Sequence, residues 1–225
     1  TWFRCLVKRR EGSVEYGWYE MTFMTCWLPD RCIMLCINTP TSMQSKLQAT
    51  LSGGSLSLDV RDPFSLYVPL MDEIVKLYDL SVWGIRDLIR PIEKARKQGN
   101  YGKHFSLLED MVRHSVHVTE VLMVALANTQ DIVKYRQTLL SQAPAKSDKE
   151  ELVLDKTTSY MNFQVQLLRN LKHRQQSNHD RVQTETTLAF NMTTMRDSRS
   201  MKTVAVLTMV YLPATFTSAS FIPLL

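Results

Sequence analysis

Glycine is scarce in this chain, with seven residues among 225. Tight turns and sheet-rich folds draw on glycine, so this scarcity favours a mainly helical protein. Charge is absent from the last stretch, because no Asp, Glu, Lys or Arg occurs from Thr203 to Leu225. Basic runs with interleaved aromatic residues are also absent, although the net charge is +5. We therefore expect no nucleic acid partner.

Catalytic motifs are missing as well. The chain has no glycine-rich phosphate loop, no nucleophile elbow and no His-Glu-x-x-His pair, so we expect that it is not an enzyme. Its four cysteines all precede residue 37 without Cys-x-x-Cys spacing, and the first histidine is His104. This pattern predicts reduced thiols rather than a zinc site, and no tightly bound cofactor.

The first 60 residues have the composition of strands separated by turns. Aromatic and β-branched residues fill two segments up to Trp27, and Cys32 to Ile37 form a third. Three strands make a small sheet, so we interpret residues 1–60 as the β-rich remnant of a cytosolic α/β domain. The chain begins at Thr1 rather than at a methionine, and we expect it to be a fragment or to have a processed start.

Residues 61–145 have the periodicity of two long helices. Asp62 and Pro63 are a typical helix cap and first helical residue, and apolar residues then recur every three or four positions. A second periodic segment runs from about His104 to Ser141. We predict an antiparallel helical hairpin.

The remainder predicts one very long helix. Neither proline nor glycine occurs from Asp148 to Leu212, so we expect a stalk helix over residues 146–202 that continues into a transmembrane helix over residues 203–225. The uncharged stretch would be about 34 Å long as a helix, enough for a hydrocarbon core of about 30 Å. Arg196, Arg199 and Lys202 precede it, which predicts that the soluble part of an integral membrane protein faces the cytoplasm or the mitochondrial matrix.

The C-terminal residues carry a family resemblance. Met201-Lys202 and the later Pro213, Thr215 and Phe216 resemble the first membrane helix of CorA-like magnesium transporters. Stretches 72–83 and 163–172 and the Ala189-Phe-Asn sequence resemble CorA-like proteins of filamentous fungi. The resemblance implies transport of divalent cations, with magnesium as the transported or regulatory ion. It also implies membrane lipid as a partner and a homo-oligomer, which is a pentamer in the family.

The chain departs from the family pattern in one place. The family's first membrane helix ends with Gly-Met-Asn, and counting from Pro213 this triplet should fall at Ile222-Pro223-Leu224, where it is absent. The chain also ends before a second membrane helix. Two alternatives therefore stay open beside transport: a non-conducting, membrane-anchored helical scaffold, and a soluble helical bundle whose tail is buried against the hairpin.

Two sets of residues are candidates for ion contact. The first set matches pore-lining positions of the family and recurs every three or four positions: Met201, Val204, Thr208, Leu212 and Thr215. The alternative is that these residues form an interface between helices without a pore. The second set consists of acidic residues of the hairpin: Asp72, Glu73, Asp79, Glu109 and Asp110. By analogy with the family, they could form weak sites for divalent cations between subunits, and the alternative is an ordinary solvated helix face.

A histidine pair is a further candidate. His114 and His117 lie three residues apart, with Asp110 one turn earlier, which can place metal ligands on one helix face. No fourth ligand stands out, and this favours an ordinary hydrogen-bonded pair.

Overall fold

The computed structural model describes residues 1–225 except 12–14, 29–30, 54–61, 97–104, 143–147 and 221–225. The strands come first: β1 (Trp2–Glu11), β2 (Glu15–Leu28) and β3 (Arg31–Ile37). The helices follow: α1 (Thr41–Ser52), α2 (Tyr67–Arg96), α3 (Phe105–Gln142) and α4 (Asp148–Ser220). The expected architecture of an N-terminal sheet and long helices is confirmed, whereas the division into four domains stays a prediction.

The sheet is an antiparallel meander in the order β1-β2-β3. Its register pairs Cys5 with Met21 and Phe3 with Phe23, so these residues point to the same face. Cys5, Met21 and Phe23 are buried on that face, which packs against the helices. Alternation between apolar inward and more exposed outward side chains thus fixes which side of the sheet the helices cover.

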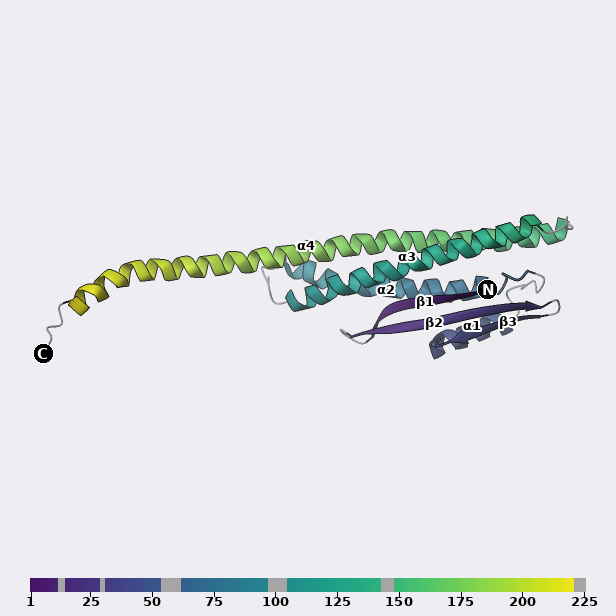
Figure 1. Cartoon of the computed structure of the whole chain (residues 1–225), viewed down its shortest axis with the longest axis horizontal. Coiled ribbons are helices and arrows are strands. Elements are labelled where there is room, and N and C mark those ends of the chain that lie inside the picture. Colours follow the sequence, from purple (N-terminus) through teal and green to yellow (C-terminus); the bar gives the residue numbers. More distant parts are fainter. Residues whose placement is uncertain (12–14, 29–30, 54–61, 97–104, 143–147, 221–225) are drawn as a thin grey trace.

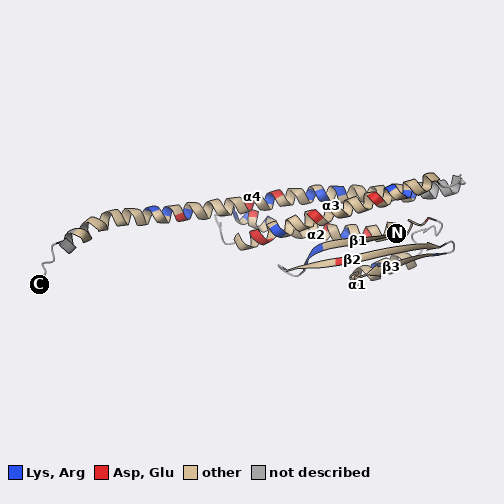
Figure 2. Ribbon diagram, in the orientation of Figure 1, with Lys and Arg blue, Asp and Glu red and all other residues tan. Residues whose placement is uncertain are grey.

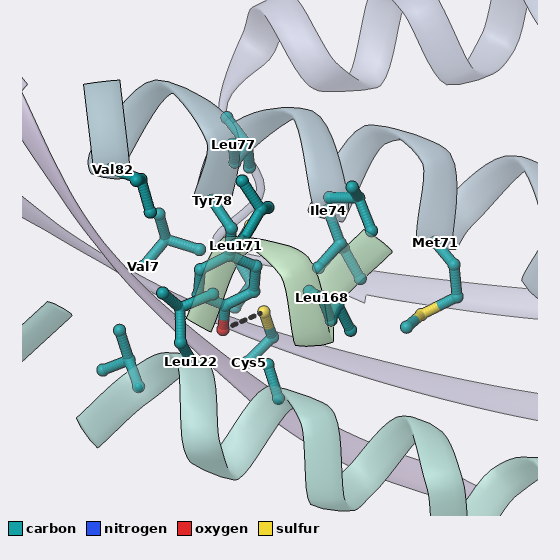
Figure 3. Close-up of a cluster of buried hydrophobic side chains, with 14 of the residues drawn as sticks. Cys5, Val7, Met71, Ile74, Leu77, Tyr78, Val82, Leu122, Leu168 and Leu171 are labelled. Carbon is teal, nitrogen blue, oxygen red and sulfur yellow. Dashed lines mark hydrogen bonds between the residues drawn. The ribbon is translucent and has the colours of Figure 1, made fainter. Parts of the chain in front are cut away.

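The helices form two layers on this sheet (Figure 1). α2 and α3 lie along β1, and α4 lies across the far side of both. One core joins all three layers, as Figure 3 shows: Cys5 comes from β1, Ile74 and Tyr78 from α2, Leu122 from α3 and Leu168 from α4. α2 and α3 contact each other less than each of them contacts α4. The two helices of the predicted hairpin are therefore held together mainly through α4.

The start of α2 differs from the prediction. The helix begins at Tyr67, because the Asp62 side chain is engaged in a turn instead of capping α2. One carboxylate oxygen of Asp62 accepts a hydrogen bond from the Phe64 backbone N–H at 2.9 Å. The other lies 2.9 Å from an Nη atom of Arg136, and both side chains are buried. Arg136 also donates a hydrogen bond to Thr158, so this ion pair ties the turn before α2 to α3 and α4.

α4 is one continuous helix of 73 residues, which corresponds to a length of about 110 Å. The prediction of a very long helix is therefore confirmed. Its first part, up to Ala189, packs on α2 and α3, and Ala189 is the last of the described side chains of α4 that is buried. Every side chain from Phe190 to Pro213 is exposed. We call the part of α4 from Phe190 to Ser220 the bare end; Figure 1 shows it extending away from the rest of the molecule.

The predicted membrane crossing by residues 203–225 is not found. Within the described residues, no helix is both long enough and apolar enough to cross a membrane. The prediction relied on the absence of charge, but hydroxyl side chains such as Thr203, Thr208 and Thr215 interrupt the apolar ones and lower the mean hydropathy. Residues 221–225, where Gly-Met-Asn was sought, lie outside the described residues. The alternative in which the tail is buried against the hairpin is wrong for residues 203–213, since their side chains are exposed.

We predict that Arg136→Met lowers the free energy of unfolding by about 3–5 kcal/mol, because it leaves the buried Asp62 carboxylate without its cation. Urea denaturation measures this. Arg113→Met is the matched control on the same helix, since Arg113 pairs with Asp110 at the surface and its loss should change stability little. Equal effects of the two substitutions would contradict the structural role of the buried pair.

Candidate functional site

Polar contacts hold α4 along its whole packed length. Near its beginning, the Tyr160 hydroxyl donates to the two carboxylate oxygens of Asp72 on α2, at 2.8 and 2.7 Å, and the Gln164 amide donates to the same carboxylate. Further along, the Gln175 amide donates to the Ser115 carbonyl and hydroxyl on α3, at 3.0 and 2.9 Å. These contacts set the position of α4 along both neighbouring helices.

Two ion pairs come last before α4 leaves the bundle. The Arg181 guanidinium donates two hydrogen bonds to the Glu93 carboxylate, at 2.7 and 2.6 Å. Arg96 reaches the buried carboxylate of Glu185 at 2.7 Å. The hydrogen bond from Arg181 is the main reason that the pKa of Glu93 is lowered, so this carboxylate is ionised at neutral pH. We call these two pairs the exit clamp, since α4 makes its last buried contact one turn later, at Ala189.

The predicted pore-lining residues all lie on the bare end. Met201 is 73% exposed, and Val204 and Leu212 are also largely exposed. The Thr208 hydroxyl donates to the Val204 carbonyl at 2.7 Å, and the Thr215 hydroxyl lies within 3.0 Å of the Tyr211 and Leu212 carbonyls. A threonine hydroxyl that donates to its own helix still has lone pairs to accept hydrogen bonds. Their assignment to a pore stays a prediction.

The other residues of the family motif lie on the same segment. Lys202 is exposed and is the last charged residue of the chain, as the uncharged end of α4 in Figure 2 shows. Pro213 lies inside the helix, and Phe216 is 73% exposed.

The acidic candidates are not gathered into one site within the chain. Asp72 accepts hydrogen bonds from α4, Glu73 is buried and pairs with Lys76 at 2.6 Å, and Asp79 accepts a hydrogen bond from the Trp83 indole at 2.9 Å. Asp110 pairs with Arg113, and Glu109 is exposed. No group of three or more His, Cys, Asp or Glu able to hold a metal occurs in the described part of the chain. Because the predicted sites would form between subunits, they stay a prediction.

The two histidines of the pair face the sheet. The His114 ring stacks on Tyr16 with ring centroids 3.7 Å apart. His117 Nδ1 lies 2.8 Å from Lys8 Nζ, and Lys8 in turn lies over the Trp18 ring at 4.7 Å. Burial, followed by the charges of Lys8 and Arg113, lowers the pKa of His114 to about 4 and also lowers that of His117. Both rings are therefore neutral at physiological pH and join α3 to the sheet.

Sequence reasoning missed the exit clamp and the partners of the histidines. Glu93 and Arg181 are 88 residues apart, and Lys8 and His117 are 109 residues apart. Local periodicity carries no signal for such pairs. One available clue was the placement of Asn178 and Glu185 on the helix face that also carries Val182, because polar residues on a buried face require partners.

We predict that acid weakens the attachment of α3 to the sheet. The pKa of His114 is about 4 in the folded protein and about 6.5 in an unfolded chain, so the unfolded state binds the proton more readily. The stabilisation is complete above pH 6.5 and is lost as the pH falls from 6.5 towards 4. Urea midpoints measured across this range should fall less steeply for His114→Phe, which keeps a ring against Tyr16 without a titrating group. Identical slopes would contradict the assignment.

Comparison with known proteins gives the family. The chain matches the family described as CorA-like Mg2+ transporter protein over residues 3–221. It is also similar to Notoamide biosynthesis cluster protein M' of Aspergillus versicolor, with 27% identity over 257 aligned positions. That alignment covers 98% of this chain and 54% of the relative, so the chain spans about half the length of this curated relative. The family match includes the sheet, the helical layers and the whole of the bare end, and the chain therefore belongs to the CorA-like Mg2+ transporter family.

Proposed function

We propose that this chain transports divalent cations, with magnesium as the ion, as the cytosolic part and membrane-entering helix of a homo-oligomeric channel. The observation that carries the proposal is the bare end of α4, whose side chains from Phe190 to Pro213 are all exposed and whose residues fall within the family match. A long helix of exposed Val, Leu, Met and Phe side chains requires burial against lipid or other copies. The pentameric state comes from the family resemblance, and no catalytic activity is part of the proposal.

The bare end would enter the membrane as one member of a packed ring rather than as a lone helix. The threonine and serine hydroxyls of the bare end can face neighbouring helices or a hydrated axis in such a ring. Arg196, Arg199 and Lys202 would remain on the near side, in the cytoplasm or the mitochondrial matrix. Membrane lipid is thus a proposed partner of the residues beyond Lys202.

The pore-facing positions suit an ion that keeps its water. Magnesium dehydrates reluctantly, so a pore for the hydrated ion needs hydrogen-bond acceptors rather than a cage of carboxylates. Thr208 and Thr215 supply hydroxyl oxygens, while Met201, Val204 and Leu212 supply apolar side chains at the other pore-facing positions. Acidic residues of the bundle, such as Asp72 and Asp110, remain candidates for regulatory ion contacts between subunits.

One observation favours a second function. Ile222-Pro223-Leu224 stand where the family has Gly-Met-Asn, the triplet at the pore mouth. A chain of this family without the triplet could serve as a non-conducting, membrane-anchored helical scaffold.

Magnesium uptake in a transporter-deficient host separates the two functions. We compare the chain as it stands with a variant that carries Gly-Met-Asn at residues 222–224 and a second membrane helix appended after Leu225. Uptake by both supports transport by the chain itself. Uptake by the extended variant alone supports the scaffold function, and uptake by neither, with both proteins in the membrane fraction, contradicts the transport proposal.

We predict that Leu212→Asp abolishes membrane association and uptake, because a carboxylate near the middle of a membrane costs about 3 kcal/mol. Leu80→Asp is the matched control, since Leu80 is exposed on α2 and lies far from α4's bare end in sequence. Membrane fractionation and uptake are measured for both. A Leu212→Asp protein that fractionates and transports normally would show that Leu212 is not at membrane depth.

A further inference from the structure

Lys8 on β1 is a buried lysine without an acidic partner. It is 4% exposed, and within the described residues it forms no ion pair with a carboxylate. Its neighbours are a neutral ring nitrogen of His117, 2.8 Å from Nζ, and the face of the Trp18 ring. Burial, followed by the charge of Arg113, lowers the pKa of Lys8, so its surroundings oppose the charged form. Because buried lysines are almost always paired, an anion beside Lys8 would be stabilised.

Three polar atoms near Lys8 are buried and have no hydrogen-bond partner in the described part of the chain. They are Nε of Arg10, the hydroxyl oxygen of Tyr16 and Nδ1 of His114. Lys8 Nζ lies 5.9 Å from the centre of the Tyr16 ring, and the Tyr16 ring stacks on His114. Buried polar atoms nearly always form hydrogen bonds, so unpartnered ones around a buried cation indicate a binding site.

The register of the sheet explains why these groups meet. Lys8 lies opposite Trp18 in the pairing of β1 with β2. Two residues further along β1, Arg10 lies opposite Tyr16, so all four side chains belong to one face of the sheet. α3 adds two histidine rings at the same place. We call these six residues the basic–aromatic cluster: Lys8, Arg10, Tyr16, Trp18, His114 and His117.

The basic–aromatic cluster combines positive charge with an open rim. Trp18 is 48% exposed, and Arg113 on α3 is also exposed, so the cluster lies next to solvent. Asp110 and Glu120 are the acidic groups that act on the two histidines. Asp110 is paired with Arg113 at 2.7 Å, and Glu120 is exposed. The positive charge of the cluster is therefore not neutralised by an ion pair with any described carboxylate.

We propose that the basic–aromatic cluster binds phosphate, either as the inorganic ion or as the phosphate group of a small phosphomonoester. Lys8 and Arg10 are the cationic contacts, and the Tyr16 hydroxyl is a further donor. Phosphate carries a charge of about −1.5 to −2 at neutral pH and accepts charge-assisted hydrogen bonds on several oxygens, which suits two cations and a hydroxyl better than a carboxylate does. The site lies on the sheet and α3, away from the bare end, and does not depend on the proposed transport.

Isothermal titration calorimetry with inorganic phosphate tests the site. The full chain, purified in detergent, is titrated at constant ionic strength and without magnesium, which would itself bind phosphate. Lys8→Met removes the buried cation and should weaken phosphate binding about tenfold or more, because it removes a hydrogen bond between charged groups. Lys134→Met is the matched control, since Lys134 is exposed on α3 and its loss should leave the affinity unchanged.

Tyr16→Phe separates binding from folding. It removes the hydroxyl and keeps the ring that stacks on His114. Because this hydroxyl has no partner among the described residues, the urea midpoint in phosphate-free buffer should not fall, whereas phosphate binding should weaken several-fold. Tyr135→Phe is the control on α3, where the ring is 49% exposed, and should change neither quantity. This pair decides the question even if Lys8→Met fails to fold.

The outcomes are distinct. No binding at millimolar phosphate, or equal affinities of the parent, Lys8→Met and Tyr16→Phe proteins, would overturn the site. A lower urea midpoint for Tyr16→Phe without phosphate would also overturn it, because the hydroxyl would then be bonded within the protein. Adenosine monophosphate identifies the source of the phosphate. Tighter binding than inorganic phosphate, lost in Trp18→Ala, supports a phosphomonoester whose ring stacks at the rim, and equal or weaker binding supports the free ion.

Discussion

The structure depends on the length of α4. A helix of about 110 Å presents more surface than α2 and α3 can cover, so the chain buries one face of α4 as far as Ala189 and leaves the side chains from Phe190 to Pro213 exposed. The buried face combines apolar residues such as Leu168 and Val182 with polar ones such as Gln175 and Glu185. The apolar residues supply the burial energy, and the polar residues fix the position of the helix because each needs a particular partner.

The exit clamp marks the boundary between these two parts of α4. Arg181 and Glu185 lie one turn apart and pair with Glu93 and Arg96 near the end of α2. Charge-assisted hydrogen bonds of this kind are directional, so they define the angle at which α4 leaves the bundle.

Sequence reasoning captured what depends on local pattern. The aromatic and β-branched composition of the first 37 residues and the absence of proline and glycine from Asp148 to Leu212 were enough to predict the sheet and the very long helix. The prediction that Asp62 caps α2 was wrong. Its carboxylate instead pairs with the buried guanidinium of Arg136, and α2 begins at Tyr67. No membrane-spanning helix is found within the described residues, although no charged residue follows Lys202. The exit clamp and the Lys8–His117 contact could not be predicted, because they join residues that are about 90 or more positions apart.

The candidate site was therefore predictable as a segment but not as a set of contacts. The bare end contains Met201, Lys202 and the Pro213–Phe216 motif, all on the part of α4 that extends beyond the bundle. The most direct measurement is protection of this segment by lipid. The purified chain is added to vesicles and digested with proteinase K, and the fragments that remain with the vesicles are identified by mass. The account predicts a protected fragment that begins near Lys202. Digestion of this region to the same extent with and without vesicles would contradict it.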